Sequence, residues 1–164
     1  MEVKNYVQGE WVSGQGEEIN HFHSITGEHI STSSSKGLDY EAILSYGREK
    51  GSSSLRKMTF QQRGEMLKSL ALYLNKRKEI FYELSKATGA TKIDSWIDIE
   101  GGIGNIFANA SLRKNFPDLP YHVDGDMAPL SKNGTFIGHH IMTPKQGVAI
   151  HINAFNFPLP VDEV

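Results

Sequence analysis

The chain has 164 residues, contains no cysteine and carries a formal net charge of −2 at pH 7. The length suits one ordinary domain. The lack of cysteine excludes disulfides, thiolate metal ligands and cysteine nucleophiles from these residues, and the charge gives no general attraction to nucleic acid or to a membrane surface. No apolar run is long enough to span a bilayer and no signal-peptide pattern begins the chain, so we expect a cytoplasmic protein that binds neither nucleic acid nor membrane.

Two β-hairpins are predicted in the first part of the chain. Residues 3–12 hold two short β-prone pieces around Gln8-Gly9, and residues 18–34 hold a second pair that turns at 26–28. His21 and His23 lie on one predicted strand face, and paired histidines can bind a metal ion. No third ligand has suitable spacing, so we predict no metal site.

Two helical segments follow. The first is expected over residues 39–51. The second begins at Thr59, which forms a capping-box pattern with Gln62, is interrupted at residues 75–78 and ends before Gly89.

A third long helix is predicted over residues 91–116, with Thr91 as its cap. Its apolar face is expected to hold Trp96, Ile99, Ile103, Ile106, Phe107 and Ala110. The glycines at 101, 102 and 104 destabilise a helix by roughly 1 kcal/mol each relative to alanine. Close helix packing would justify them. A phosphate cradle is less favoured, because the G-x-G-x-x-G spacing and a preceding strand are both missing.

The remaining residues are the most β-like. Residues 115–135 indicate a turn-rich connector, 136–142 a strand, 143–147 a turn, and 148–152 a nearly continuous apolar run. Such a run is typical of a strand covered on both faces in a parallel sheet, where ligands bind at the carboxyl ends of the strands. The sequence therefore predicts an α/β fold, with residues 153–157 at a strand end.

Asn156 is the candidate for chemistry at that strand end. A fixed amide NH₂ can donate a hydrogen bond to a developing oxyanion and stabilise a transition state by roughly 3–4 kcal/mol. Asparagine also commonly caps loops and helices, and spacing alone favours this second interpretation.

Four stretches carry a family resemblance: "MTFQQRGEMLKSLALYL", "ATGATKIDSWIDIEGGIGN", "PLSKNGTF" and "GVAIHINAFNFP". From about Tyr6 to Pro158 the chain resembles the N-terminal part of aldehyde dehydrogenases, and most closely the semialdehyde dehydrogenases of phenylacetate catabolism. Members of this family oxidise an aldehyde through a thiohemiacetal on a cysteine and pass hydride to NAD or NADP.

The resemblance implies roles for particular residues. Asn156 would bind the oxyanion, and Ile152, Asn153, Ala154 and Phe155 would line the nicotinamide side of the cofactor site. Ala154-Phe155 replaces the proline–tryptophan that is commoner in the family. It also implies a Rossmann-like parallel sheet with helices, in which 148–157 is the first dinucleotide-binding strand and its carboxyl end. Residues 136–142 would belong to the β-hairpin of an oligomerisation sheet, and the full-length family member would be a homo-oligomer.

The cysteine nucleophile and the general-base glutamate of the family lie beyond the matching residues. We therefore expect residues 1–164 to be a partial, truncated dehydrogenase domain. By itself this chain is expected to be inactive toward an aldehyde or CoA-thioester semialdehyde and not to bind NAD(P). We also expect it to be partly folded and prone to aggregation. One alternative is a small interaction module that pairs through the exposed edge of 136–142. Another is complementation by a separately encoded remainder.

Overall fold

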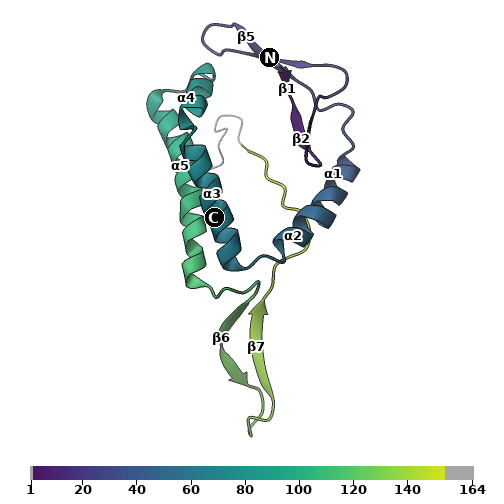
Figure 1. The fold of residues 1–164 in the computed structure, drawn as a ribbon, viewed down its shortest axis with the longest axis vertical. Coiled ribbons are helices and arrows are strands. Elements are labelled where there is room, and N and C mark those ends of the chain that lie inside the picture. The colour runs from purple at the N-terminus through teal and green to yellow at the C-terminus, as the bar shows by residue number, and fades with distance from the viewer. Residues whose placement is uncertain (1, 154–164) are drawn as a thin grey trace.

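The computed structural model describes residues 2–153. Within them, seven strands form three small sheets, and three longer helices lie to one side (Figure 1). The sole parallel pairing among the described strands joins β1 (Glu2–Val3) to β5 (His29–Ser33). A Rossmann-like parallel sheet is therefore not formed within these residues.

The first predicted hairpin is confirmed. β2 (Asn5–Val7) and β3 (Glu10–Val12) pair antiparallel. Between them, Gln8 and Gly9 have φ values of 54° and 93°. Positive φ at both central residues is what a two-residue hairpin turn of type I′ requires, and the twist of this turn matches that of the strands.

The second predicted hairpin is also confirmed. β4 (Ile19–Phe22) pairs antiparallel with β5, giving the strand order β1-β5-β4. The turn is closed by His23, whose Nδ1 accepts a hydrogen bond from the Ile25 N–H at 3.2 Å. His21 Nε2 lies 2.7 Å from Ser33 Oγ. Both histidines thus make hydrogen bonds within the hairpin.

The first helical segment is longer than predicted. Asp39 caps α1 (Tyr40–Tyr46) by accepting from the Ala42 N–H at 2.9 Å. The helix then continues through a π-helical turn, η1 (Gly47–Ser52), into α2 (Ser53–Leu55). Gly51 therefore does not end it.

The start and stop signals of the longer helices are confirmed. Capping boxes at Thr59 and Thr91 begin α3 (Phe60–Asn75) and α5 (Lys92–Ser111). The predicted interruption separates α3 from α4 (Lys78–Ala87), and Gly89, with φ 85°, follows α4. A short 3₁₀ turn, η2 (Leu112–Asn115), extends α5.

The apolar core lies between α3 and α5. Ala71 of α3 packs with Ile99 and Ile103 of α5, and all three are buried. The predicted core residue Trp96 is instead 57% exposed. Trp96 lies seven residues before Ile103, which places it about 20° from Ile103 around the helix axis and nearly two turns earlier, so helix geometry alone does not account for its exposure. The small residue Ser95 is buried in its place, and its Oγ lies 2.8 Å from Ser85 Oγ.

The glycines of α5 are only partly explained by packing. Gly102 is buried, as close packing would require. A Cβ added at Gly101 or Gly104 would meet nothing within 4 Å. Packing within the described residues therefore accounts for one of the three.

The predicted connector contains a strand. β6 (His122–Pro129) pairs antiparallel with β7 (Ile137–Met142), which confirms the strand expected at 136–142. The two project together from one end of the molecule (Figure 1). β6 contains Asp124, Gly125 and Asp126 and ends at Pro129, all residue types that are depleted in strands, so its strand conformation comes from pairing with β7 rather than from its own sequence.

The prediction of a strand at residues 148–152 is wrong within the described part of the chain. Residues 143–153 contain no strand, and the side chains of Val148, Ile150 and Ile152 are 44%, 74% and 92% exposed. A strand needs a neighbour to receive its backbone hydrogen bonds, and no described strand lies beside this segment. The site predictions for Ala154, Phe155 and Asn156 lie outside the described residues.

Candidate functional site

Two residues of the predicted cofactor segment, Ile152 and Asn153, are described, and they lie outside any helix or strand. Ile152 and Asn153 are both exposed, and no hydrogen bond among the described residues joins either one to another element. Residues 2–153 therefore do not assemble a dehydrogenase active site around them.

The preceding residues, 143–149, contact the helices. A Cβ at Gly47 would lie 3.0 Å from Val148 Cγ2, so glycine permits this close approach. The Gly147 N–H donates to Ser52 Oγ at 3.4 Å. The segment thereby closes one side of a groove with a volume of about 690 Å³. Its lining is Ser52, Leu55, Arg56, Phe60, Arg63, Phe116, His122, Met142 and residues 143–149.

Aromatic rings form one wall of this groove. Phe60 and Phe116 are stacked, with centroids 4.4 Å apart and planes 11° from parallel. His122 meets Phe116 edge-on at 5.1 Å. The Arg63 guanidinium lies over the Phe60 ring at 4.6 Å, within the range of a cation–π contact.

The charges that line the groove have one sign. Arg56, Arg63 and Lys145 are cationic, and the lining contains no aspartate or glutamate. Arg63 donates to the Met58 carbonyl at 3.0 Å. The ion pairs among residues 2–153 involve neither Arg56 nor Lys145. This arrangement favours an anion over a cation.

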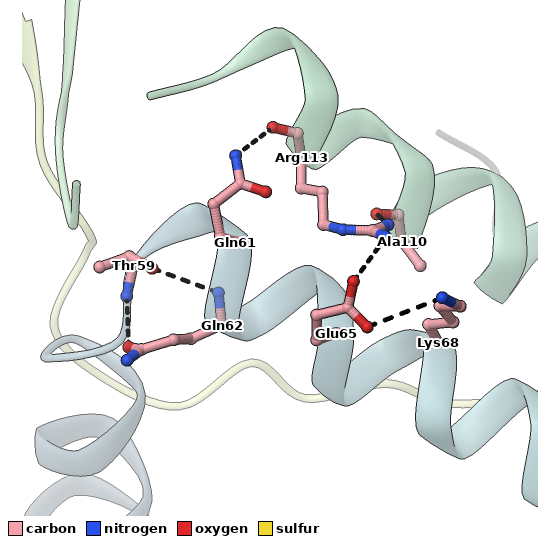
Figure 2. A network of polar contacts seen from close by, with 7 residues as sticks. All are labelled: Thr59, Gln61, Gln62, Glu65, Lys68, Ala110 and Arg113. Atoms are coloured by element: carbon pink, nitrogen blue, oxygen red, sulfur yellow. Dashed lines mark hydrogen bonds and ion pairs between the residues drawn. The ribbon is translucent and has the colours of Figure 1, made fainter. Parts of the chain in front are cut away.

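The wall is held in place by the junction of α3 with α5 and η2 (Figure 2). The Gln61 amide donates to the carbonyls of Arg113 and Phe116 at 2.9 and 3.0 Å. Arg113 forms an ion pair with Glu65 at 2.6 Å and donates to the Ala110 carbonyl at 2.7 Å. The backbone on which Phe116 sits is therefore fixed relative to α3.

A second polar cluster ties α4 to α5. Lys78 Nζ lies 2.8 Å from Glu100 Oε1, and the Tyr82 hydroxyl donates to the same oxygen at 3.1 Å. The hydrogen bond between Lys78 and Glu100 lowers the pKa of Glu100 and raises the pKa of Lys78. Partial burial, together with the bond to Glu100, raises the pKa of Tyr82. Each side chain is satisfied by its neighbour, so the cluster is structural.

Two further kinds of feature are absent from residues 2–153, a metal-binding cluster and a membrane-spanning helix. No group of three histidine, cysteine, aspartate or glutamate side chains is placed to hold a metal ion there. No helix among residues 2–153 is long and apolar enough to span a bilayer.

The sequence did not predict this groove, which we call the basic aromatic groove after its cationic and aromatic lining. Phe60 and Phe116 come from segments far apart in the chain, and Lys145 joins them from a predicted turn. The available signal was the stretch 56–63, which holds basic residues and no acidic one around Phe60, but that signal is weak without knowing which segments meet.

Comparisons with known proteins extend over nearly the whole chain. The sequence model of the aldehyde dehydrogenase family matches residues 11–161. The chain is also similar to a 3,4-dehydroadipyl-CoA semialdehyde dehydrogenase of Aromatoleum evansii, with 33% identity over 159 residues. That alignment covers 96% of this chain and 31% of the relative, so the chain spans about a third of the relative's length.

Proposed function

The chain belongs to the aldehyde dehydrogenase family, and on this premise we propose that it acts as the N-terminal part of an NAD(P)-dependent semialdehyde dehydrogenase. The observation that carries the proposal is the family match itself, which runs through residue 161 and so includes the segment around Asn156. The relative is named for a CoA-linked semialdehyde. We therefore propose a CoA-thioester semialdehyde of aromatic-acid catabolism, such as phenylacetate breakdown, as the substrate class.

Asn156 is proposed to stabilise charge. When a thiolate attacks an aldehyde carbon, the carbonyl oxygen becomes an oxyanion, and an amide N–H placed beside it lowers the energy of that state. Asparagine does not titrate near neutral pH, so its part is hydrogen bonding rather than proton transfer. The thiolate has to come from outside these 164 residues, which contain no cysteine. We infer that these residues alone do not turn over an aldehyde.

We propose that the described residues alone do not bind a dinucleotide. Gly101, Gly102 and Gly104 lie in the middle of α5, where the helix uses their backbone N–H groups. Ile152 and Asn153 are exposed on a segment without a neighbouring strand. We propose that residues 152–155 contribute to a nicotinamide site only when further strands of the dehydrogenase lie beside them.

The exposed surface supports a role within a larger assembly. The chain exposes 12504 Å², whereas a compact monomer of this mass exposes about 8,100 Å². Large apolar side chains of α3, α4 and α5 contribute, among them Leu70, Ile80 and Ile97. Surface of this kind usually marks a contact with other protein.

The β6–β7 hairpin is proposed as the oligomerisation element. Apolar side chains on both of its strands are exposed, including Val123, Met127 and Ile141. Both outer edges of this two-stranded sheet are open within residues 2–153, and an open edge can pair with a strand of another chain. Family membership favours this role within an oligomeric dehydrogenase over a stand-alone interaction module.

A chimera tests the proposed function. Residues 1–158 would replace the corresponding N-terminal residues of the A. evansii enzyme, and reduction of NAD or NADP would be followed with a CoA-thioester semialdehyde. We expect turnover by the chimera and none by the 164-residue chain. Asn156→Ala should lower kcat by about 100- to 1,000-fold with little change in KM, while Asn133→Ala, in the β6–β7 turn, should have no effect.

Two results would contradict the proposal. A folded, oligomeric chimera without activity would argue against dehydrogenase function for these residues. Full activity of the Asn156→Ala chimera would remove the oxyanion role and leave Asn156 as a cap.

A further inference from the structure

The turn that joins β6 to β7 contains the one asparagine–glycine pair of the sequence, Asn133-Gly134. The turn lies at the free end of the hairpin, away from the helices (Figure 1). We propose that Asn133 is a modification site, whose side-chain amide is lost spontaneously through a cyclic imide formed with the backbone of Gly134. The reaction needs no enzyme and no partner, so it is independent of the dehydrogenase function proposed above.

The chemistry exchanges an amide for an acid. The backbone nitrogen of Gly134 gives up its proton and attacks Cγ of Asn133, so that an N–Cγ bond forms. The Cγ–Nδ2 bond breaks, and Nδ2 takes up the proton and leaves as ammonia. Water then opens the imide at either of its carbonyls, which gives aspartate or isoaspartate. Amide and water become carboxylic acid and ammonia, nothing is oxidised or reduced, and the acid is ionised at neutral pH.

Glycine at position 134 leaves the attacking nitrogen uncovered. Every other asparagine of the sequence is followed by a residue with a side chain, whose Cβ stands beside the nitrogen that would attack. A Cβ built on Gly134 would meet nothing within 4 Å, so the surroundings are open as well. Residues 132–135 are all exposed, and solvent therefore reaches both reacting groups.

Hydrogen bonds hold this turn only lightly at Asn133. Ser131 Oγ lies 3.2 Å from Thr135 Oγ1 and accepts from the Phe136 N–H at 3.1 Å. The Asn133 amide makes no side-chain hydrogen bond to another described residue. One bond opposes the attack, because the Gly134 N–H donates to the Ser131 carbonyl at 3.2 Å. That distance is at the long end of the range for such bonds, and exposed loop tips open at little cost in free energy.

Asn109 has the opposite surroundings in the same chain. It is exposed too, but it lies inside α5 and its Nδ2 donates to the carbonyl and side-chain oxygens of Asn105 at 3.1 and 3.0 Å. The nitrogen that would attack belongs to Ala110, which is 1% exposed. Attack there requires the helix to open, so exposure of the asparagine alone does not make a site.

The products change the tip of the hairpin and leave its strands paired. Isoaspartate adds one carbon to the main chain at position 133, so the bond between the Gly134 N–H and the Ser131 carbonyl loses its geometry. The next bond inward, from the Leu130 N–H to the Phe136 carbonyl at 2.8 Å, then closes the hairpin. The new carboxylate also places a negative charge next to Lys132.

Peptide mass spectrometry of the aged chain tests the proposal. The 164-residue chain would be kept at mildly alkaline pH, in buffer and in guanidinium chloride, and digested at intervals at mildly acidic pH. The ratio of the rate in buffer to the rate in denaturant cancels the intrinsic reactivity of each asparagine. We expect this ratio to be at least about tenfold larger at Asn133 than at Asn109, because opening α5 costs more free energy than opening the turn. Mass is followed because Asp124-Gly125 can form isoaspartate without a change in mass.

Asn133→Gln is the matched variant, because its longer side chain would have to close a larger ring. It should abolish conversion at this position over the same time. Three results would overturn the proposal: equal ratios at Asn133 and Asn109, undiminished conversion in Asn133→Gln, and a product with aspartate but no isoaspartate, which would mean direct hydrolysis. None of them bears on the chimera assay of Asn156, so the two proposals fail separately.

Discussion

Alanine at Gly64 and alanine at Gly101 are expected to change the stability of the same helix pair in opposite directions. Both glycines lie inside long helices, Gly64 in α3 and Gly101 in α5. A Cβ at Gly64 would lie 2.8 Å from Arg113 Cβ and 2.9 Å from the Ala110 carbonyl oxygen. A Cβ at Gly101 would meet nothing within 4 Å.

The magnitudes follow from two opposing effects. Replacing glycine by alanine inside a helix stabilises it by about 1 kcal/mol. At Gly64 the added methyl group overpacks the contact between α3 and η2, which typically destabilises by about 1–3 kcal/mol. It also displaces Arg113 from its ion pair with Glu65. We therefore expect Gly64→Ala to destabilise the helix pair by about 1–2 kcal/mol and Gly101→Ala to stabilise it by up to about 1 kcal/mol.

Native-state amide hydrogen exchange measures this local stability without requiring the whole chain to unfold cooperatively. Protected amides of α3 and α5 should exchange about five- to thirtyfold faster in Gly64→Ala and up to about fivefold slower in Gly101→Ala. Gly104→Ala is the matched control, because its Cβ also meets nothing within 4 Å. Equal or slower exchange in Gly64→Ala would refute the reasoning that glycine is needed for close approach of Arg113.

Three further predictions concern a cap, the core and the α4–α5 cluster. Thr59→Ala removes a capping box and should destabilise the start of α3 by about 1 kcal/mol; unchanged exchange in the first turn would contradict this. Ile99→Ala opens a cavity at a buried position and should lower the free energy of unfolding, measured by urea titration, by about 2–4 kcal/mol. Ile93 is 69% exposed, so Ile93→Ala should change that free energy by less than about 0.5 kcal/mol. Similar effects of the two substitutions would argue against the assigned core face. The pKa of Glu100 is lowered in the folded chain by Lys78, so the stability it contributes is present above the ordinary glutamate pKa of 4.5 and is lost as pH falls through the lower folded pKa. Amides of α4 should therefore lose protection on acidification below that value, and Glu100→Gln should reduce this dependence; an identical pH profile in the variant would contradict it.

Much of the secondary structure could be predicted because its signals are local. The boxes at Thr59 and Thr91 each join residues three positions apart, and Gln8-Gly9 sets its own turn. Gly89 ends α4 because glycine readily adopts its positive φ. None of these signals depends on which distant segment packs nearby.

The errors occur where distant segments decide the outcome. β6 is a strand because β7 lies beside it, and residues 148–152 are not one within the described residues because no strand does. Trp96 is exposed, whereas Ile103, which lies close to it in helix angle and about two turns later, is buried against α3. In each case the local pattern allowed two outcomes, and a neighbour from elsewhere in the chain selected one.

The candidate sites divide in the same way. Asn156 was found from a short motif and its family resemblance, and its role remains a prediction because it lies outside the described residues. The basic aromatic groove is visible only in the structure, since Phe60, Phe116 and Lys145 meet through the packing of α3, α5 and the chain after β7.

The sequence by itself determined the family, the caps, the turns and the helix ends, because each depends on residue identities within a few positions or on a continuous motif. Only the tertiary structure decided which face of α5 is buried, which polar segment becomes a strand, and which cations share a surface without carboxylates. The physical reason is that packing, strand pairing and electrostatic surroundings depend on side chains brought together from remote parts of the chain.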